Sequence, residues 1–484
     1  MTQVTTVRTY GGWRERRGFG VAGMDGRGTA IAVGVGVLVL GVGMFTSTGL
    51  LVIAPVLGVL VGAGVLRWRG EPVAVLVRRH LAFRRAARRG WTVHTAGAGR
   101  PAGAEWTLPG PLAGTALLEA DDAQARSWAA IWDRRAGTLT GVLRVAPTST
   151  WLVEAEQVDE WVESWHGWLA GLGYATQVCH VTVTVETTPA PPSALDAAVR
   201  PRITDSAPEA SRRLLDELLA DAPAAAAAVA TRVAVTIDPA RGPADGASMA
   251  EQMAEFSRVL DALGRALAGC GVAVLGRATR QDLIAVTRGA FDPASRDALG
   301  RGRTGLSWPD ARPMAAVEAW DHYRADSGVS VTWGWDEAPR QAVTATVLAG
   351  LISPGAWPKR VTMLYTPTPA AAAARELDLQ AQAATFRSQI KARTGRDETA
   401  RDVADRARAM QAAAEEAAGA GLVTMALYVT VTVADAADLP RAVADTEARA
   451  DEGRIRLRRL YGGQAVGFAT GLSAGVNPAV LQGR

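Results

Sequence analysis

The sequence predicts an α+β protein in which an N-terminal two-helix transmembrane hairpin precedes cytoplasmic strand–helix–strand modules, ferredoxin-like or related. Two observations predict this class. The chain carries no charged residue from Gly28 to Leu66, which is long enough for two membrane-spanning helices. Farther along, segments in which apolar and polar residues alternate flank segments with helical periodicity, the pattern of split strand–helix–strand units.

Length and composition narrow the choice of protein class. The chain has 484 residues, so we expect two to four soluble units beside any membrane segment. Hydrophobic residues make up 48% of the chain and charged residues 21%, which excludes a transporter with many spans. The net charge of +4 is too small to indicate a nucleic-acid partner for the whole chain. Abundant Ala, Gly, Val and Arg, with lysine only at Lys359 and Lys391, suggest a GC-rich genome such as that of an actinobacterium.

The uncharged run divides into two predicted spans, Gly28 to Phe45 and Leu50 to Leu66, around a polar turn. Small residues recur at four-residue spacing within each span and would allow close helix packing in lipid: Ala32, Gly36, Ala54, Gly58 and Gly62. This packing is either within the hairpin or against a partner helix. A cleaved signal peptide and a buried soluble hairpin are the alternatives, but the length of the run and its lack of a charged face disfavour both.

The flanks of the run predict its orientation. Arginines gather on both sides, at positions 8, 14, 16, 17 and 27 before it and at 67, 69, 78, 79, 84, 85, 88 and 89 after it. By the positive-inside rule both termini are then cytoplasmic, and we expect a two-span protein of the cell membrane. The basic segment from Arg78 to Arg89 fits either nucleic acid or anionic lipid, and its interleaved apolar residues favour lipid.

The predicted organisation has six parts. They are a basic N-terminus at 1–27, the membrane hairpin at 28–66, a basic juxtamembrane segment at 67–100, and α/β modules at 101–190, 191–325 and 326–484. The third module contains a helical excursion at 370–418, rich in Ala, Arg and Glu.

Each module has recognisable elements. The first combines strands at Leu139–Ala146 and Gln177–Glu186 with a helix at Glu154–Ala170. The second has a helix at Ala198–Ala230, a strand at Arg232–Ile237, a helix at Ser248–Ala268 and a strand at Val272–Leu275. The third begins with a strand at Ser327–Trp335, a helix at Ala342–Leu351 and a strand at Arg360–Tyr365. It ends with a strand at Leu422–Val433, a helix from Asp438 to about Gly453 and a strand at Ile455–Leu460.

Motifs that would indicate catalysis are missing from the sequence. Neither lysine lies in a phosphate-binding loop, and no HExxH or GxSxG motif occurs. Cys179 and Cys270 form no CxxC pair, so a zinc site or disulfide framework is not expected. The most reactive-looking run is Asp321 to Arg324. We therefore expect no catalytic, cofactor-binding or metal-binding residues, and a protein that is not an enzyme.

Three tryptophans share one face of the first predicted helix: Trp161, Trp165 and Trp168. Such a stripe most often packs in a core. The alternative is an aromatic interface patch, because tryptophans are enriched at protein–protein contacts.

Several segments resemble actinobacterial conjugation-type secretion proteins. The run from Arg8 to Trp13 leads through arginines into the uncharged hairpin, as in proteins with a PrgI-like hairpin. The segments from Glu156 to Trp161 and from Ser327 to Arg340 look like the same family. The strand at Tyr428–Val433, then Leu460-Tyr461-Gly462-Gly463-Gln464 with Phe468 and Gly475, resembles the region before the motor of type IV secretion ATPases. The motor domain itself has no counterpart in the 484 residues.

The resemblance implies a non-catalytic membrane scaffold of a type IV-like secretion or conjugation machine. Its expected partners are membrane lipid, a separate secretion ATPase with a P-loop motor, other membrane subunits of the apparatus and further copies of itself, with no direct nucleic-acid contact. A two-span peripheral membrane subunit of a type VII-like secretion core is the alternative. A membrane-tethered enzyme, for example a transferase, is a third.

Overall fold

The structure, a computed structural model, describes residues 9–11, 67–68, 71–96, 107–149, 153–189, 199–204, 206–225, 227–300, 305–337, 339, 341–393, 400–417 and 419–482. The chain divides into two units. The first comprises Met1–Gly11, Trp91–Thr368 and Val423–Arg484, and the second comprises Gly12–Gly90 and Pro369–Leu422.

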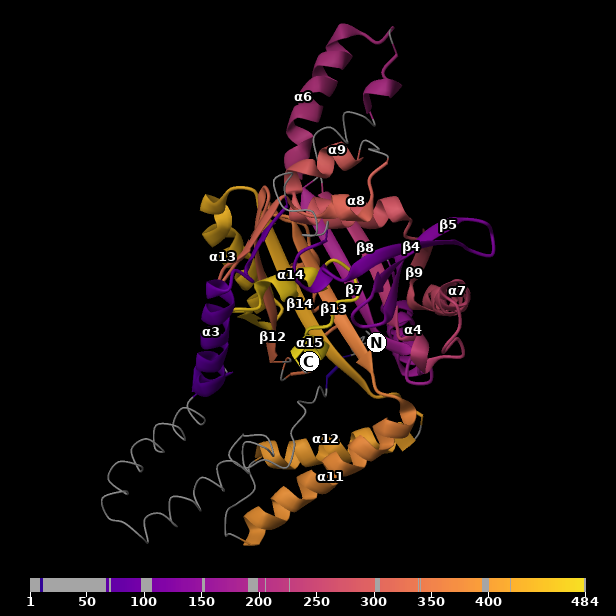
Figure 1. The fold of residues 1–484 in the computed structure, drawn as a ribbon, viewed down its shortest axis with the longest axis vertical. Coiled ribbons are helices and arrows are strands. Elements are labelled where there is room, and N and C mark those ends of the chain that lie inside the picture. Colours follow the sequence, from indigo (N-terminus) through magenta and orange to yellow (C-terminus); the bar gives the residue numbers. More distant parts are fainter. Residues whose placement is uncertain are drawn as a thin grey trace, which may run out of the picture. The chain divides into compact units, whose positions relative to one another are not determined.

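The first unit is organised around one 13-stranded antiparallel sheet (Figure 1). Along the main path the order is β3-β10-β11-β12-β14-β13-β7-β8-β6-β5-β4, while β15 pairs with β12 and β9 with β6. The strands are β3 (Val93–Thr95), β4 (Thr115–Asp121), β5 (Ser127–Asp133), β6 (Thr138–Pro147), β7 (Val178–Pro189), β8 (Ala227–Ile237), β9 (Val272–Arg277), β10 (Ala315–Glu318), β11 (Tyr323–Ala325), β12 (Gly328–Glu337), β13 (Lys359–Pro367), β14 (Val423–Val433) and β15 (Arg456–Arg459).

The sheet contains the same arrangement twice. The first half runs β6, α4 (Ala155–Gly171), β7, β8, α7 (Met249–Leu267), β9. The second runs β12, α10 (Ala349–Ile352), β13, β14, α13 (Leu439–Glu452), β15. In each half the fourth strand pairs with the first, the first with the third and the third with the second. A hairpin precedes each half, β4–β5 in one and β10–β11 in the other, and extends the sheet outward.

The predicted fold class is wrong in its overall plan. The expectation was a membrane hairpin followed by separate modules, whereas the strands join into one continuous sheet. The two halves meet where β7 pairs with β13, in register from Val181–Tyr365 to Thr187–Lys359. An unpaired strand at this position would leave a row of backbone groups without partners, so edge-to-edge pairing explains why the halves fuse.

The predicted two-span localisation is also corrected. Among the described residues, no helix combines the length and the apolar character needed to cross a bilayer. The longest described helix, α11 (Ala370–Arg393), carries several charged side chains along its length. The predicted spans at residues 28–66, with Ala32, Gly36, Ala54, Gly58 and Gly62, lie outside the part of the chain that the structure describes.

Helices and loops cover both faces of the sheet. Residues directly opposite each other in paired strands point to the same face. Val181 of β7 lies opposite Tyr365 of β13, and this face packs against α4 and α7 in the first half and α10 and α13 in the second. The opposite face, with Thr184 and Thr362, is covered by α8 (Arg280–Phe291) and by α14 (Gln464–Thr470).

Local sequence explains the main helices of this unit. Helix α7 begins at a capping box in which Ser248 and Glu251 bond reciprocally to each other's backbone amides. Its apolar residues Phe256 and Leu260 are fully buried one turn apart. Gly271, at φ 69°, follows the last turn and turns the chain toward β9.

Two predicted helices differ from the structure. Of the predicted helix at Ala198–Ala230, only α6 (Glu209–Ala225) is a long helix, and β8 begins already at Ala227. Pairing of Ala227 with Pro189 of β7 overrides the helical preference of the alanine tract. The predicted helix at Ala342–Leu351 is reduced to the single turn of α10.

The second unit contains three described helices. α3 (Val73–Arg88) is the basic segment, with no acidic residue in its first turn and Arg85 and Arg88 in its last. α11 and α12 (Ala400–Ala417) form the excursion between β13 and β14 and pack against each other. A short pair of strands, β1 (Arg67–Trp68) and β2 (Glu71–Pro72), precedes α3. The remaining short helices, α9 (Arg296–Gly300) and α15 (Pro478–Gln482), belong to the first unit.

Candidate functional site

The tryptophan stripe of α4 lies in the core between α4, α7 and the sheet. Trp168 is 6% exposed and donates its indole N–H to the Leu263 carbonyl oxygen at 3.1 Å. Trp165 stacks on Trp168 with ring centroids 4.9 Å apart and meets Tyr365 of the second half edge-on. Packing thus accounts for Trp165 and Trp168, and an interface role for the stripe stays a prediction.

Trp161 lies at the outer end of the stripe, against the turn that follows α7. A Cβ atom at Gly271 would come within 2.4 Å of the Trp161 ring, so the glycine is required for this close approach. Trp161 and Trp165 are both partly buried, whereas Trp168 is buried, and Trp165 also contacts two aromatic rings.

A row of buried hydroxyl pairs crosses the opposite face of the sheet. Each pair joins neighbouring strands: Thr140–Thr236 at 2.9 Å, Thr184–Thr362 at 3.0 Å, Thr332–Thr430 at 3.0 Å and Ser330–Thr432 at 2.9 Å. The Thr184–Thr362 pair lies on the seam between the halves, and the others lie within one half or the other. This row makes the interior of the face polar, although it is shielded from solvent.

The C-terminal segment covers this polar row. Gln464 is fully buried, accepts from the Thr332 amide at 2.8 Å and donates to the Thr332 and Leu460 carbonyl oxygens. Gly475, at φ 77°, lies so close to Thr140 that an added Cβ would be 2.1 Å from its hydroxyl oxygen. Near it, burial lowers the pKa of His180 to about 4, so this imidazole is neutral at physiological pH.

A cluster of charged side chains lies at one end of the seam. Glu186 on β7 is directly opposite Arg360 on β13 and accepts hydrogen bonds from Arg232 of β8 and, at 3.2 Å, from Arg296 of α9. The Arg296 side chain also donates to the Gly289 carbonyl oxygen at 2.8 Å. Four elements of the first unit therefore bring three guanidinium groups around one carboxylate.

The buried charges of this arginine cluster shift one another's pKa values. Burial alone would raise the pKa of Glu186, but Arg232, Arg296 and Arg360 together lower it to about 2. Burial lowers the pKa of Arg360 to about 10, opposed by Glu186. Glu186 and Arg360 are therefore charged at neutral pH. Counting each of the three arginines as +1 and Glu186 as −1 gives the cluster a formal net charge of +2.

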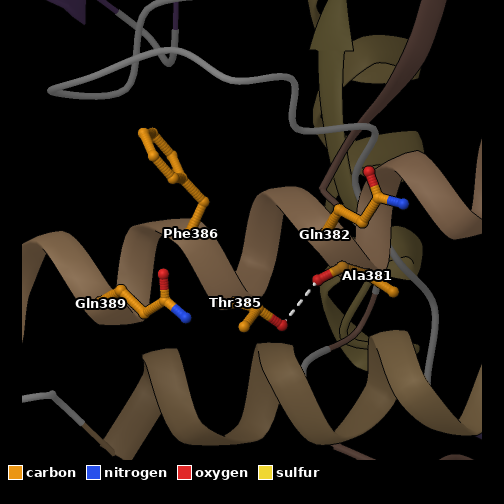
Figure 2. A pocket seen from close by; sticks show the side chains of 5 residues that line it. All are labelled: Ala381, Gln382, Thr385, Phe386 and Gln389. Atoms are coloured by element: carbon orange, nitrogen blue, oxygen red, sulfur yellow. Dashed lines mark hydrogen bonds between the residues drawn. The ribbon is translucent and has the colours of Figure 1, made fainter.

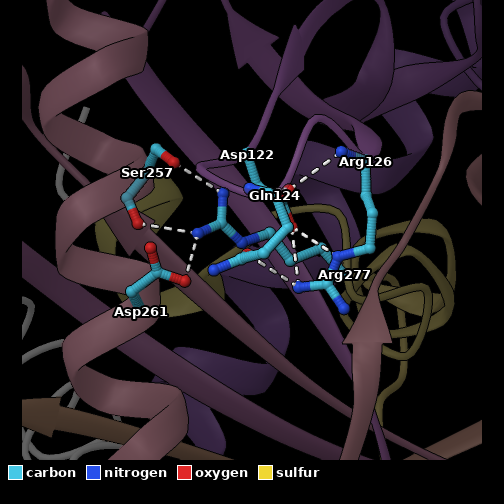
Figure 3. A network of polar contacts seen from close by, with 6 residues as sticks. All are labelled: Asp122, Gln124, Arg126, Ser257, Asp261 and Arg277. Carbon is cyan, nitrogen blue, oxygen red and sulfur yellow. Dashed lines mark hydrogen bonds and ion pairs between the residues drawn. The ribbon is translucent and has the colours of Figure 1, made fainter.

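A second polar network ties β9 to α7 (Figure 3). Arg277 donates to the Ser257 hydroxyl at 2.7 Å and to Asp261 at 2.6 Å, and its guanidinium lies 4.8 Å from the Trp128 ring centroid. In the nearby turn between β4 and β5, Asp122 accepts from the side chain and the backbone amide of Arg126. Each of these charges has an opposite charge beside it. The bonds of Arg277 hold β9 to α7, and those of Asp122 close the turn between β4 and β5.

The helical excursion presents apolar side chains to solvent. An open pocket on α11 is lined by Ala381, Gln382, Thr385, Phe386 and Gln389 (Figure 2). Phe386 projects outward from the helix and is 53% exposed, whereas Thr385 donates to the Ala381 carbonyl oxygen at 3.0 Å. Phe386 is the large apolar side chain that this pocket exposes to solvent.

In the sequence, Asp321 to Arg324 is the most reactive-looking run. In the structure these residues make contacts that hold the fold together. Asp321 shares a hydrogen bond with His322 at 2.9 Å and forms an ion pair with Arg459 of β15 at 3.6 Å, and Tyr323 is buried beside Phe468. Within the described part of the chain, no group of three or more His, Cys, Asp or Glu side chains is placed to hold a metal ion.

Comparison of the sequence with known proteins does not assign the chain to a family. No protein-family model matches the chain, and no curated protein matches it in sequence.

Sequence reasoning missed the arginine cluster. Its members are separated by 46 to 174 residues, so no motif joins them. One signal was present: Glu186 continues the Thr182–Thr184 alternation of β7, and Arg360 precedes Thr362 in β13 with the same period. Charged residues in phase with buried threonines indicate a polar inner face, which only the pairing of β7 with β13 reveals.

Proposed function

We propose that this chain is a non-catalytic scaffold subunit of a multiprotein assembly, and that its inserted helices dock protein partners. One observation carries the proposal. β13 and β14 pair as far as Pro367 opposite Val423, and β7 and β8 pair as far as Pro189 opposite Ala227. Two-residue turns would close both hairpins. Instead the chain inserts residues 368–422 and 190–226, which carry long helices.

The inserted helices carry several large apolar side chains that are exposed to solvent. On the first insertion, Leu379, Phe386, Val403 and Met410 are each about half exposed (45–54%). On the second, Leu214 is 59% exposed and Leu218 57%, four residues apart and therefore on one helix face. Both insertions follow the second strand of their half, so the two halves share this feature.

The kind of assembly follows from the sequence resemblance. We propose a type IV-like secretion or conjugation apparatus, with a separate P-loop ATPase among the docked partners. The residues that carry the resemblance near the C-terminus are compatible with a scaffold, since Gln464 and Phe468 are buried and support the sheet. A structural role of this kind suits the region before a motor domain, which need not itself hydrolyse nucleotide.

The test is affinity capture of the tagged full-length chain from its own host. Phe386→Asp with Met410→Asp places charges on the exposed apolar side chains of the first insertion, and we expect the variant to lose a P-loop ATPase that the wild type retains. Tyr174→Asp is the matched control, because Tyr174 is 69% exposed but belongs to the sheet unit. Circular dichroism checks that all variants fold.

Two outcomes would contradict the proposal. One is capture of the same set of proteins by the wild type and by the Phe386→Asp/Met410→Asp variant. The other is a wild-type chain that elutes alone, as a monomer, at every concentration tested.

A further inference from the structure

The arginine cluster at the seam has fewer negative than positive charges. Three guanidinium groups surround Glu186, and both Arg360 and Arg232 are almost wholly buried, at 2% and 7% exposure. A buried net charge of +2 is costly unless further anionic or acceptor groups compensate it. Among the described residues, Glu186 is the carboxylate that bonds these arginines.

The missing hydrogen-bond acceptors can be assigned to particular donor atoms of Arg360. Its Nη1 and Nη2 are both buried and have no hydrogen-bond partner among the described residues, and neither has Nε of Arg232. The ring of Phe468 lies 4.6 Å from the Arg360 guanidinium carbon and covers one face of it. This cation–π contact does not supply an acceptor for the Nη donors, so they remain available to an oxygen acceptor.

The cluster has an outer side. The Arg296 side chain is 23% exposed, while the side chains of Arg232 and Glu186 are 8% and 13% exposed. Arg296 divides its donors between Glu186 and the Gly289 carbonyl oxygen, which fixes its guanidinium at the rim. Arg296 is therefore the most exposed of the three arginines of the cluster.

We propose that this cluster is a binding site for a small tetrahedral oxyanion, with Arg360 as the inner ligand and Arg296 at the entrance. A phosphate or sulfate group has the charge that balances the cluster and several acceptor oxygens for planar guanidinium donors. The site lies where the two halves meet, so the anion links β7, β8, β13 and α9. It is independent of the docking role proposed for the inserted helices.

Thermal unfolding of the full-length chain in inorganic phosphate tests the site, against sodium chloride of equal ionic strength. Because a ligand that binds only the folded state raises the midpoint, we expect phosphate to raise it by a few degrees and chloride to leave it unchanged. Equal midpoints in the two salts would overturn the proposal.

Variants separate binding from general stability. Arg296→Gln, at the entrance, is expected to weaken phosphate binding at least tenfold by isothermal titration, and Arg360→Met to abolish it. Glu186→Gln removes the competing carboxylate and should strengthen binding, a result that a purely structural cluster would not give. The control is Arg277→Lys, since Arg277 is an equally buried arginine that already has Asp261 as its partner. Loss of binding in the control alone, or unchanged affinity in Arg296→Gln, would refute the site.

A second probe identifies the source of the oxyanion. O-Phosphoserine carries the same group on an organic stem. Binding of phosphate without phosphoserine supports a closed site for the free ion, and binding of both supports a site that accepts phosphate esters at its rim. Binding of neither excludes an oxyanion site.

Discussion

The two halves of the sheet share one strand order but differ in how their helices cover it. In the first half, α4 runs from Ala155 to Gly171 between the first two strands, whereas its counterpart α10 spans only Ala349–Ile352. The first half accordingly buries a single large apolar cluster beneath α4 and α7. In the second half the same face is divided into two smaller clusters, one around Trp333 and the other around Leu351.

Features that both halves of the sheet share are the ones that this strand order requires. Both halves keep a buried threonine pair between their first and third strands, Thr140–Thr236 and Thr332–Thr430. Both also insert a helical segment after their second strand. The long first helix is dispensable, because α13 and the loop near Trp357 cover the second half without it. We therefore expect the first half to be the more sensitive to core substitutions.

Phe256→Ala should give the largest effect. The Phe256 ring is fully buried under α7 and packs edge-on against Trp128. Truncation leaves a cavity in the tightly packed half and should lower the free energy of unfolding by about 4 kcal/mol, as for other buried aromatics. Urea unfolding measures the change. A loss below about 1 kcal/mol would show that the first half is no more tightly packed than the second.

Acid sensitivity should be concentrated at the seam. The pKa of Glu186 is about 2 in the folded chain, against 4.5 as its ordinary value. A lowered carboxylate pKa stabilises the fold above the unfolded pKa, and that stability is lost as pH falls from about 4.5 towards 2. The contribution is of order 3 kcal/mol. Glu186→Gln should flatten this part of the stability profile, whereas substitution of the exposed Glu119 of β4 by Gln should not. Identical profiles for the two variants would remove Glu186 as the cause.

Leu351→Ala probes the thinner cover of the second half. Leu351 is 1% exposed and belongs to the single turn of α10. A short turn can collapse into the space that the side chain leaves, so we expect a loss of about 2 kcal/mol, the low end for buried leucine. Urea unfolding beside Phe256→Ala gives the comparison directly. A loss equal to that of Phe256→Ala would mean that α10 holds the sheet as rigidly as α7.

The smallest effect should come from the hydroxyl pair on the seam. Thr184→Val leaves the Thr362 hydroxyl buried without its partner and should cost about 1 kcal/mol. Adding Thr362→Val should recover most of that loss, because two apolar groups of the same shape replace the pair. A double-mutant cycle in urea measures the coupling. Additive losses would show that the two hydroxyls do not stabilise the seam together.

Much of the local structure was predictable from the sequence. Alternation identified the strands that became β7, β12 and β14, and the spacing of the tryptophans identified α4. The strand that became β6 and the helix that became α7 were also predicted. The short strands β4, β5, β10 and β11 were not predicted, because their periodicity is weak over three to seven residues. The sequence also showed that the three tryptophans share one helix face. It could not show whether they lie in a core or at a surface, because that depends on what packs against α4.

The sequence by itself determined which residues pair within a helix or alternate along a strand, since those patterns are local and follow from the geometry of one turn or one pleat. Tertiary structure alone decided that two halves share one sheet and that Glu186, Arg232, Arg296 and Arg360 meet at its seam. Register between β7 and β13 is set by hydrogen bonds between segments about 175 residues apart. Periodicity within either strand carries no information about such a partner.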